Sequence, residues 1–143
     1  MALSGFTSAG LSGGFVIHPM EHALSGHYDI SHGRGLAVLL PAVMEYTIPA
    51  RAERYAQLAD RVFQVQDSAF SMKDKAHMCV QQMIKFLQSV NLYCRLSDLG
   101  IDDSKFEMMA EDTIRIYGGD REFLDNPQKL YKEDIVNIFE MCR

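Results

Sequence analysis

The sequence predicts an all-α domain, a helical bundle of roughly six or seven helices. Three observations support this. Apolar residues recur at helical spacing over most of the chain, and no segment alternates as a half-buried strand would. Capping residues and glycines bound the periodic segments. Because 143 residues suffice for one domain with its own core, we expect residues 1–143 to form a single helical domain.

The first expected elements lie around a cluster of histidines. Residues 2–14 are small and polar, which suits either a loop or a tightly packed helix inside a larger protein. Pro19 is compatible with a helix at the cluster only in a first turn or at a kink, because it donates no backbone hydrogen bond. A strongly apolar, buried helix begins at residues 35–41, and prolines at 41 and 49 bracket residues 42–48.

The later elements are marked by apolar stripes and by start and stop signals. Ser71 and Asp74 have the spacing of a capping box. Asp102 or Asp103 can cap the next helix, which ends at the glycine pair 118–119. Residues 120–129 are expected to form a polar loop before the last helix. The four stripes are Ala52, Tyr55, Ala59, Val62 and Phe63; Ala76, Val80, Met83, Leu87 and Val90; Phe106, Met109, Ala110, Thr113 and Tyr117; Ile135, Phe139 and Cys142.

Composition and charge exclude several classes of protein. An apolar share of 48% with 23% charged residues is typical of a soluble globular chain. A net charge of −5, without a dense run of Lys and Arg, argues against a nucleic-acid surface. No apolar run approaches the ~20 residues that span a bilayer. Cys79, Cys94 and Cys142 are odd in number and widely spaced, so we expect free thiols and a cytoplasmic location.

Four of the five histidines lie in the stretch HPMEHALSGHYDISHG, residues 18–33. His18 and His22 are four residues apart, so on a helix both imidazoles project from one face. His32 can fold back toward that face from a loop between two helices, because Gly33 adds backbone freedom. Histidine is the commonest metal ligand, so the cluster predicts a metal site. The remaining histidines are expected to be structural: His27 and His77.

The same stretch also fits the H-x-x-E-H pattern of a zinc metallopeptidase. In that interpretation His18 and His22 bind zinc, Glu21 is the general base, and Glu107 or Glu111 supplies a third ligand. Two features count against it. The proline directly after the first ligand sits badly in a regular helix, and the pattern leaves the third histidine without a role.

The motif EHALSGHYDISHGRGLA (residues 21–37), followed by a Leu-Pro pair, resembles one known family. That family is the iron-containing (group III) alcohol dehydrogenases, and the resemblance is greatest to its bacterial butanol-dehydrogenase-like branch. The segments ERYAQLADRVFQV, LSDLGIDDSKFEMMAEDT and YKEDIVNIFEMCR look like later helices and the C-terminus of that family. The resemblance covers essentially the whole chain, but only the second, helical half of the family's protein.

The resemblance implies specific roles for the histidines. His18 and His32 match the two histidine ligands that this half gives to a catalytic Fe²⁺ or Zn²⁺. His22 matches the non-ligand, catalytic histidine that contacts the nicotinamide or the substrate and helps to relay protons. The family's other two ligands, an aspartate and a histidine, lie upstream. The glycine-rich turn that binds the cofactor also lies there, in an N-terminal nucleotide-binding domain that we expect this chain to lack.

The implied function is the metal-binding, substrate-side half of a dehydrogenase that interconverts alcohols and aldehydes or ketones. NAD or NADP would bind mainly to the missing domain, so the isolated chain is expected to be inactive. The expected partners are a small alcohol or aldehyde and the chain's own N-terminal domain, within a homodimer or larger oligomer, and neither nucleic acid nor membrane.

Two alternatives to the dehydrogenase stay open. A peptidase would depend on Glu21, which should matter little in a dehydrogenase. A non-catalytic helical interaction module would have no nucleotide-binding domain encoded upstream.

Overall fold

The structure is a computed structural model that describes residues 16–65, 69–125 and 128–143. Within these ranges the chain forms five α-helices, which confirms the all-α class, although six or seven helices were expected. Residues 2–14, expected as a loop or packed helix, lie outside the described residues. Among the helices described, none is long and apolar enough to cross a bilayer. The helices are α2 (Ile17–Tyr28), α3 (His32–Arg61), α4 (Met72–Ser89), α5 (Phe106–Thr113) and α6 (Lys132–Met141).

Short elements connect α4 to α6. Ahead of α5 the chain makes two 3-10 turns, and after α5 it continues into a π-helical segment and a third 3-10 turn. A two-stranded antiparallel ladder then leads to α6. These elements are η1 (Ser97–Leu99), η2 (Asp103–Lys105), η3 (the π-helix Ile114–Gly118), η4 (Gly119–Arg121), β1 (Leu124–Asp125) and β2 (Lys129–Leu130).

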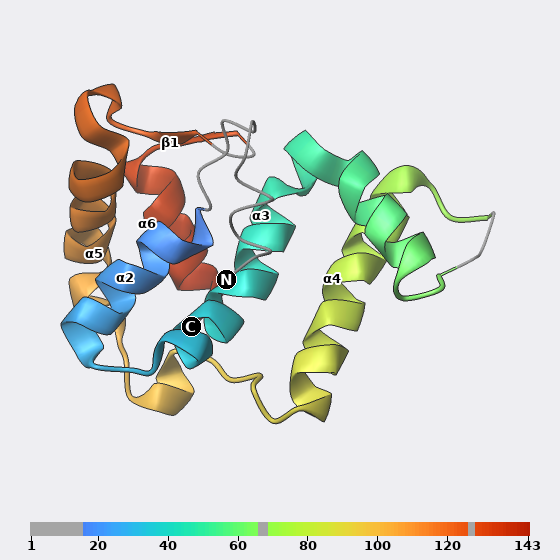
Figure 1. Cartoon of the computed structure of the whole chain (residues 1–143), viewed down its shortest axis with the longest axis horizontal. Coiled ribbons are helices and arrows are strands. Elements are labelled where there is room, and N and C mark those ends of the chain that lie inside the picture. Colours follow the sequence, from blue (N-terminus) through green and yellow to red (C-terminus); the bar gives the residue numbers. More distant parts are fainter. Residues whose placement is uncertain (1–15, 66–68, 126–127) are drawn as a thin grey trace, which may run out of the picture.

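The apolar side chains form two cores joined by α3. In Figure 1, α2 and α6 lie beside the first part of α3 and α5 packs against α2 and α6, while the last turns of α3 lie beside α4. The first core includes the stacked rings of Phe106 and Phe139, with centroids 5.6 Å apart. The second core joins Ile48 of α3 to Ala76 and Val80 of α4. Members of the predicted stripes supply both cores, whereas Val62, Val90 and Tyr117, also assigned to stripes, are exposed.

Helix α3 differs from the expectation of a separate segment between two prolines. Pro41 and Pro49 both lie inside one helix, which the first of them does not end. Pro41 is buried, so its ring packs in the interior. The backbone leaves helical geometry at Arg51 (φ −139°, ψ 23°), two residues after Pro49. This break lets the end of α3 turn onto α4 (Figure 1).

The predicted start and stop signals are confirmed. Asp74 N donates to Ser71 Oγ at 3.2 Å, and the Asp74 carboxylate accepts from Ser71 N at 3.1 Å, which completes the capping box of α4. Asp102 accepts from Ser104 N at 3.1 Å and so caps η2, immediately before α5. The helical run that begins with α5 ends at the predicted glycine pair, where Gly119 has φ +57°.

The expected polar loop at residues 120–129 contains part of the small ladder. Leu124 pairs with Leu130 and Asp125 pairs with Lys129. Both leucines are buried in the first core. Each strand has only two residues, so the sequence alternation that marks longer strands does not develop.

All three cysteines are free thiols, as expected. Burial raises the pKa of the Cys142 thiol to about 12 and that of the Cys79 thiol to about 11. Cys94 is half-buried. The two buried cysteines therefore act as small apolar core residues rather than as thiolates.

Candidate metal centre

Two helices place three of the clustered histidines together. α2 begins at Ile17, so Pro19 lies in its first turn, where the missing N–H has no partner to lose. His18 and His22 are then one turn apart on α2. The chain reverses after α2 through Asp29, which has φ +51°, and His32 is the first residue of α3.

The three imidazoles converge at a spacing that fits metal binding. The ring centroids of His18 and His32 are 5.3 Å apart, those of His22 and His32 are 5.5 Å apart, and those of His18 and His22 are 6.3 Å apart. Two imidazoles that bind one tetrahedral ion through nitrogens about 2.0–2.1 Å away have centroids about 5 Å apart. All three side chains are exposed, so an ion there would be open to further ligands.

His22 has a neighbour that the sequence did not identify. A hydrogen bond joins Nδ1 of His22 to the hydroxyl of Tyr117, and their ring centroids are 5.8 Å apart. The helical spacing places Tyr117 in a core stripe, but it is exposed on the π-helix η3. Single π-helical turns occur frequently at functional sites. The glycine pair that follows Tyr117 was the only sequence sign of an irregular helix end.

Glu21 lies beneath the histidines. Its side chain is fully buried, and it is the only charged residue in the interior of the described part of the chain. Oε1 accepts a hydrogen bond from Ser25 Oγ, and Oε2 pairs with Nδ1 of His32. The potential ligand atoms that lie within 4.8 Å of one another belong to Glu21, His22 and His32, and this group does not include His18.

The other acidic residues named for a peptidase lie elsewhere. Glu107 and Glu111 are exposed on α5 and pair with Lys132 at 3.0 and 3.6 Å. The remaining histidine outside the cluster, His77, pairs with Glu45 at 2.8 Å. None of these side chains is therefore part of the candidate metal site formed by the three histidines.

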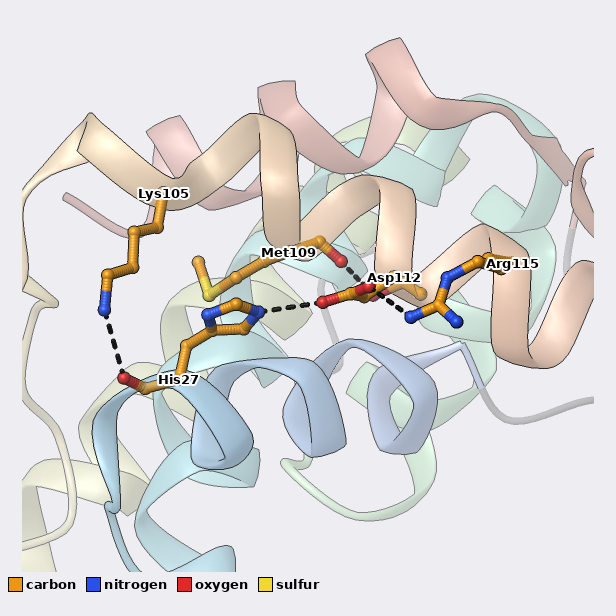
Figure 2. Close-up of polar contacts among 6 residues, drawn as sticks. His27, Lys105, Met109, Asp112 and Arg115 are labelled. Carbon is orange, nitrogen blue, oxygen red and sulfur yellow. Dashed lines mark hydrogen bonds and ion pairs between the residues drawn. The ribbon is translucent and has the colours of Figure 1, made fainter.

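His27 contacts α5 and also lines a cavity that His22 and Tyr117 share. Its Nε2 lies 2.9 Å from Asp112, whose other oxygen accepts from Arg115 at 2.6 Å (Figure 2). In the same view Lys105 donates to the backbone carbonyl of His27 at 3.4 Å. His27 thus holds α2 against α5, the structural role expected of it.

This contact predicts a pH dependence of stability. Hydrogen bonds from Arg115, and secondarily from His27, lower the pKa of Asp112 below its ordinary 3.8. A carboxyl whose pKa is lower in the folded state stabilises the fold above its unfolded pKa, and this contribution is lost as the pH falls through the folded value. We expect Asp112→Asn to lower the melting temperature at neutral pH, by an amount that shrinks below pH 3.8.

Thermal melts of both proteins across this range measure the difference. Asp120→Asn, at an exposed aspartate on η4, is the matched control and should have little effect. A deficit of Asp112→Asn that stays constant down to acidic pH would contradict the assignment.

Comparison with known proteins identifies the family. A family model described as "Fe-containing alcohol dehydrogenase family, C-terminal" matches residues 1–142. The chain belongs to the iron-containing alcohol dehydrogenase family. The NADH-dependent butanol dehydrogenase B of Clostridium acetobutylicum is 30% identical to this family member over 142 residues, which are 98% of the chain and 35% of that protein.

Other relatives of this family member are also named as alcohol or diol dehydrogenases. The 1,3-propanediol dehydrogenase of Citrobacter freundii is 32% identical over 126 residues, which are 88% of the chain and 31% of that protein. The solved alcohol dehydrogenase from Oenococcus oeni superposes with a TM-score of 0.82 at 34% identity, over 99% of the chain and 35% of that structure. The chain thus spans about a third of the length of these relatives.

Proposed function

We propose that the chain is the metal-binding, substrate-side part, about a third of the length, of an NAD(P)-dependent alcohol dehydrogenase. The reaction would interconvert small alcohols and aldehydes or ketones. We place the intact enzyme in the cytoplasm, as a homodimer or larger oligomer that includes a nucleotide-binding domain. The family supports the reaction class, and the names of two relatives include butanol and propanediol as substrates.

The convergence of three imidazoles from α2 and α3 carries the proposal. His18 and His32 would bind Fe²⁺ or Zn²⁺, and their centroid separation of 5.3 Å, the shortest of the three, suits two ligands of one ion. When bound, the metal would polarise the alcohol oxygen, and the nicotinamide would accept the hydride. Further ligands would have to come from outside the three histidines.

His22 would act beside the metal as the catalytic, cofactor-contacting histidine. Nδ1 of its ring is hydrogen-bonded to Tyr117, so Nε2 is the ring nitrogen available for contact with the cofactor or the substrate. A proton that arrives on the imidazole therefore has a hydroxyl neighbour to move toward. A cavity of about 230 Å³ opens beside His22, lined also by Ile116 and Tyr117, which could accept an alcohol's short carbon chain.

The peptidase alternative is disfavoured by the surroundings of Glu21. A general base must reach a water molecule at the metal. The Glu21 side chain is fully buried, and its two oxygens are engaged by Ser25 and His32.

The isolated 143-residue chain should catalyse neither alcohol oxidation nor aldehyde reduction. The sequence has no glycine-rich phosphate-binding turn, and two histidines make only half of a four-ligand site. The test is an absorbance assay of NADH or NADPH consumption with simple aldehydes, with added Fe²⁺ or Zn²⁺. Measurable turnover would contradict the assignment of cofactor binding to another domain.

A further inference from the structure

The buried carboxylate of Glu21 needs an explanation. Burial of a charged side chain is costly unless it is paired and hydrogen-bonded. Glu21 meets both conditions, since Ser25 donates to one oxygen and His32 pairs with the other. The residues lie on adjacent helical turns of α2 and at the first position of α3, so the contact holds the α2–α3 corner together.

Because Gly35 has no side chain, the Glu21 side chain can pack directly against the backbone of α3. A Cβ atom added at Gly35 would lie 2.8 Å from both Cγ and Oε1 of Glu21, closer than real Cβ contacts allow. Glycine is one of the least favourable residues inside a helix, yet Gly35 lies in the first turn of α3. His32 and Gly35 are three residues apart and therefore share the face of α3 that covers Glu21.

We propose that Glu21 is a positioning residue for His32, a role that rests on the proposed function. The carboxylate accepts a hydrogen bond from Nδ1–H of His32, which selects that tautomer and directs Nε2 toward His18 and His22. Metal-binding histidines commonly donate their second N–H to such a carboxylate, which fixes the ring and increases its basicity. Glu21 then matters in a dehydrogenase, contrary to the expectation from the sequence.

The geometry favours this role over direct metal binding by Glu21. A ligating carboxylate needs an oxygen that faces the ion, whereas both oxygens of Glu21 are directed at protein donors. The chain also contains a second pair of a histidine Nδ1 and a glutamate carboxylate, which lies outside the histidine cluster. His77 pairs with Glu45 at 2.8 Å where both side chains are partly exposed, which supplies a matched control.

The first test uses the unsubstituted chain. Long-range ¹H–¹⁵N NMR distinguishes the two neutral tautomers of His32, at a pH well above the unperturbed histidine pKa of about 6.5. We expect His32 to carry its proton on Nδ1. A proton on Nε2 would overturn the proposal without any substitution.

The second test compares zinc affinity by calorimetry. Glu21→Gln keeps the shape of the side chain and removes its charge, and we expect about 10–100-fold weaker zinc binding and a loss of the single His32 tautomer. Glu45→Gln, the matched control, should change neither. Unchanged affinity and tautomer in Glu21→Gln would overturn the positioning role while leaving His18 and His32 as ligands. If the unsubstituted chain does not bind zinc, the proposed function fails first, and the positioning role with it.

A pair of substitutions tests the contact if Glu21→Gln does not fold. Gly35→Ala should weaken zinc binding when Glu21 is present, because the added methyl group displaces the carboxylate. In the Glu21→Ala background the obstructing atoms are gone, so Gly35→Ala should have no further effect. Equal effects in the two backgrounds would show that Gly35 and Glu21 are not coupled, and would overturn the proposal.

Discussion

In the chain carrying His18→Ala or His32→Ala, we expect zinc binding to be lost, whereas His22→Ala should retain most of it. The unsubstituted chain should bind zinc only weakly, because a tight structural site takes four protein ligands and this cluster supplies two. Removal of either ligand leaves one imidazole, which cannot hold the ion. His22 differs because its Nδ1 is engaged by Tyr117.

Calorimetric zinc titrations of the three variants measure these losses. His77→Ala is the matched control, since this histidine pairs with Glu45 outside the cluster and should not affect binding. The peptidase alternative predicts a different order, in which His18→Ala and His22→Ala abolish binding and His32→Ala does not. An essential His22 with a dispensable His32 would therefore show that the ligand assignment is wrong.

The largest expected loss of stability follows from Phe139→Ala. The ring is fully buried and stacks on Phe106, so it joins α6 to α5 in the first core. Truncation of a buried phenylalanine costs about 3–5 kcal/mol in the free energy of unfolding, because a cavity remains. Since domains are commonly stable by about 5–15 kcal/mol, this is a large share of the total.

Chemical denaturation followed by circular dichroism measures the difference. Phe86→Ala is the matched control, because Phe86 is 53% exposed on α4 and its truncation should change stability by less than about 0.5 kcal/mol. Similar losses in the two variants would contradict the placement of Phe139 in a packed core.

Local signals in the sequence predicted most of the helices. The Ser71–Asp74 capping box and the apolar stripes depend on residues within one or two turns, so they can be read without a structure. The helix continues across the buried Pro41, which the local sequence did not predict, because proline is a helix-breaking signal when read locally. The ladder of β1 and β2 is too short to show a periodic pattern.

The candidate site was predictable in part for the same reason. His18 and His22 share a helix face by spacing alone, and the convergence of His32 followed from an expected turn. Tyr117 lies on the π-helix that ends the α5 helical run, where it is exposed and bonded to His22, and the helical periodicity of the sequence did not predict this. The role inferred for Glu21 depends on the fit between α2 and α3 at Gly35, a contact between helices that periodicity does not encode.

A crystal structure of the chain soaked with zinc, with the ion located by anomalous scattering, tests the ligand assignment most directly. We predict one ion bound by Nε2 of His32 and by a ring nitrogen of His18, each about 2.0–2.1 Å from the metal. His22 should lie beside the ion without binding it, and Glu21 should remain hydrogen-bonded to His32. An ion held by Glu21 and His22, with His32 unbound, would contradict the assignment.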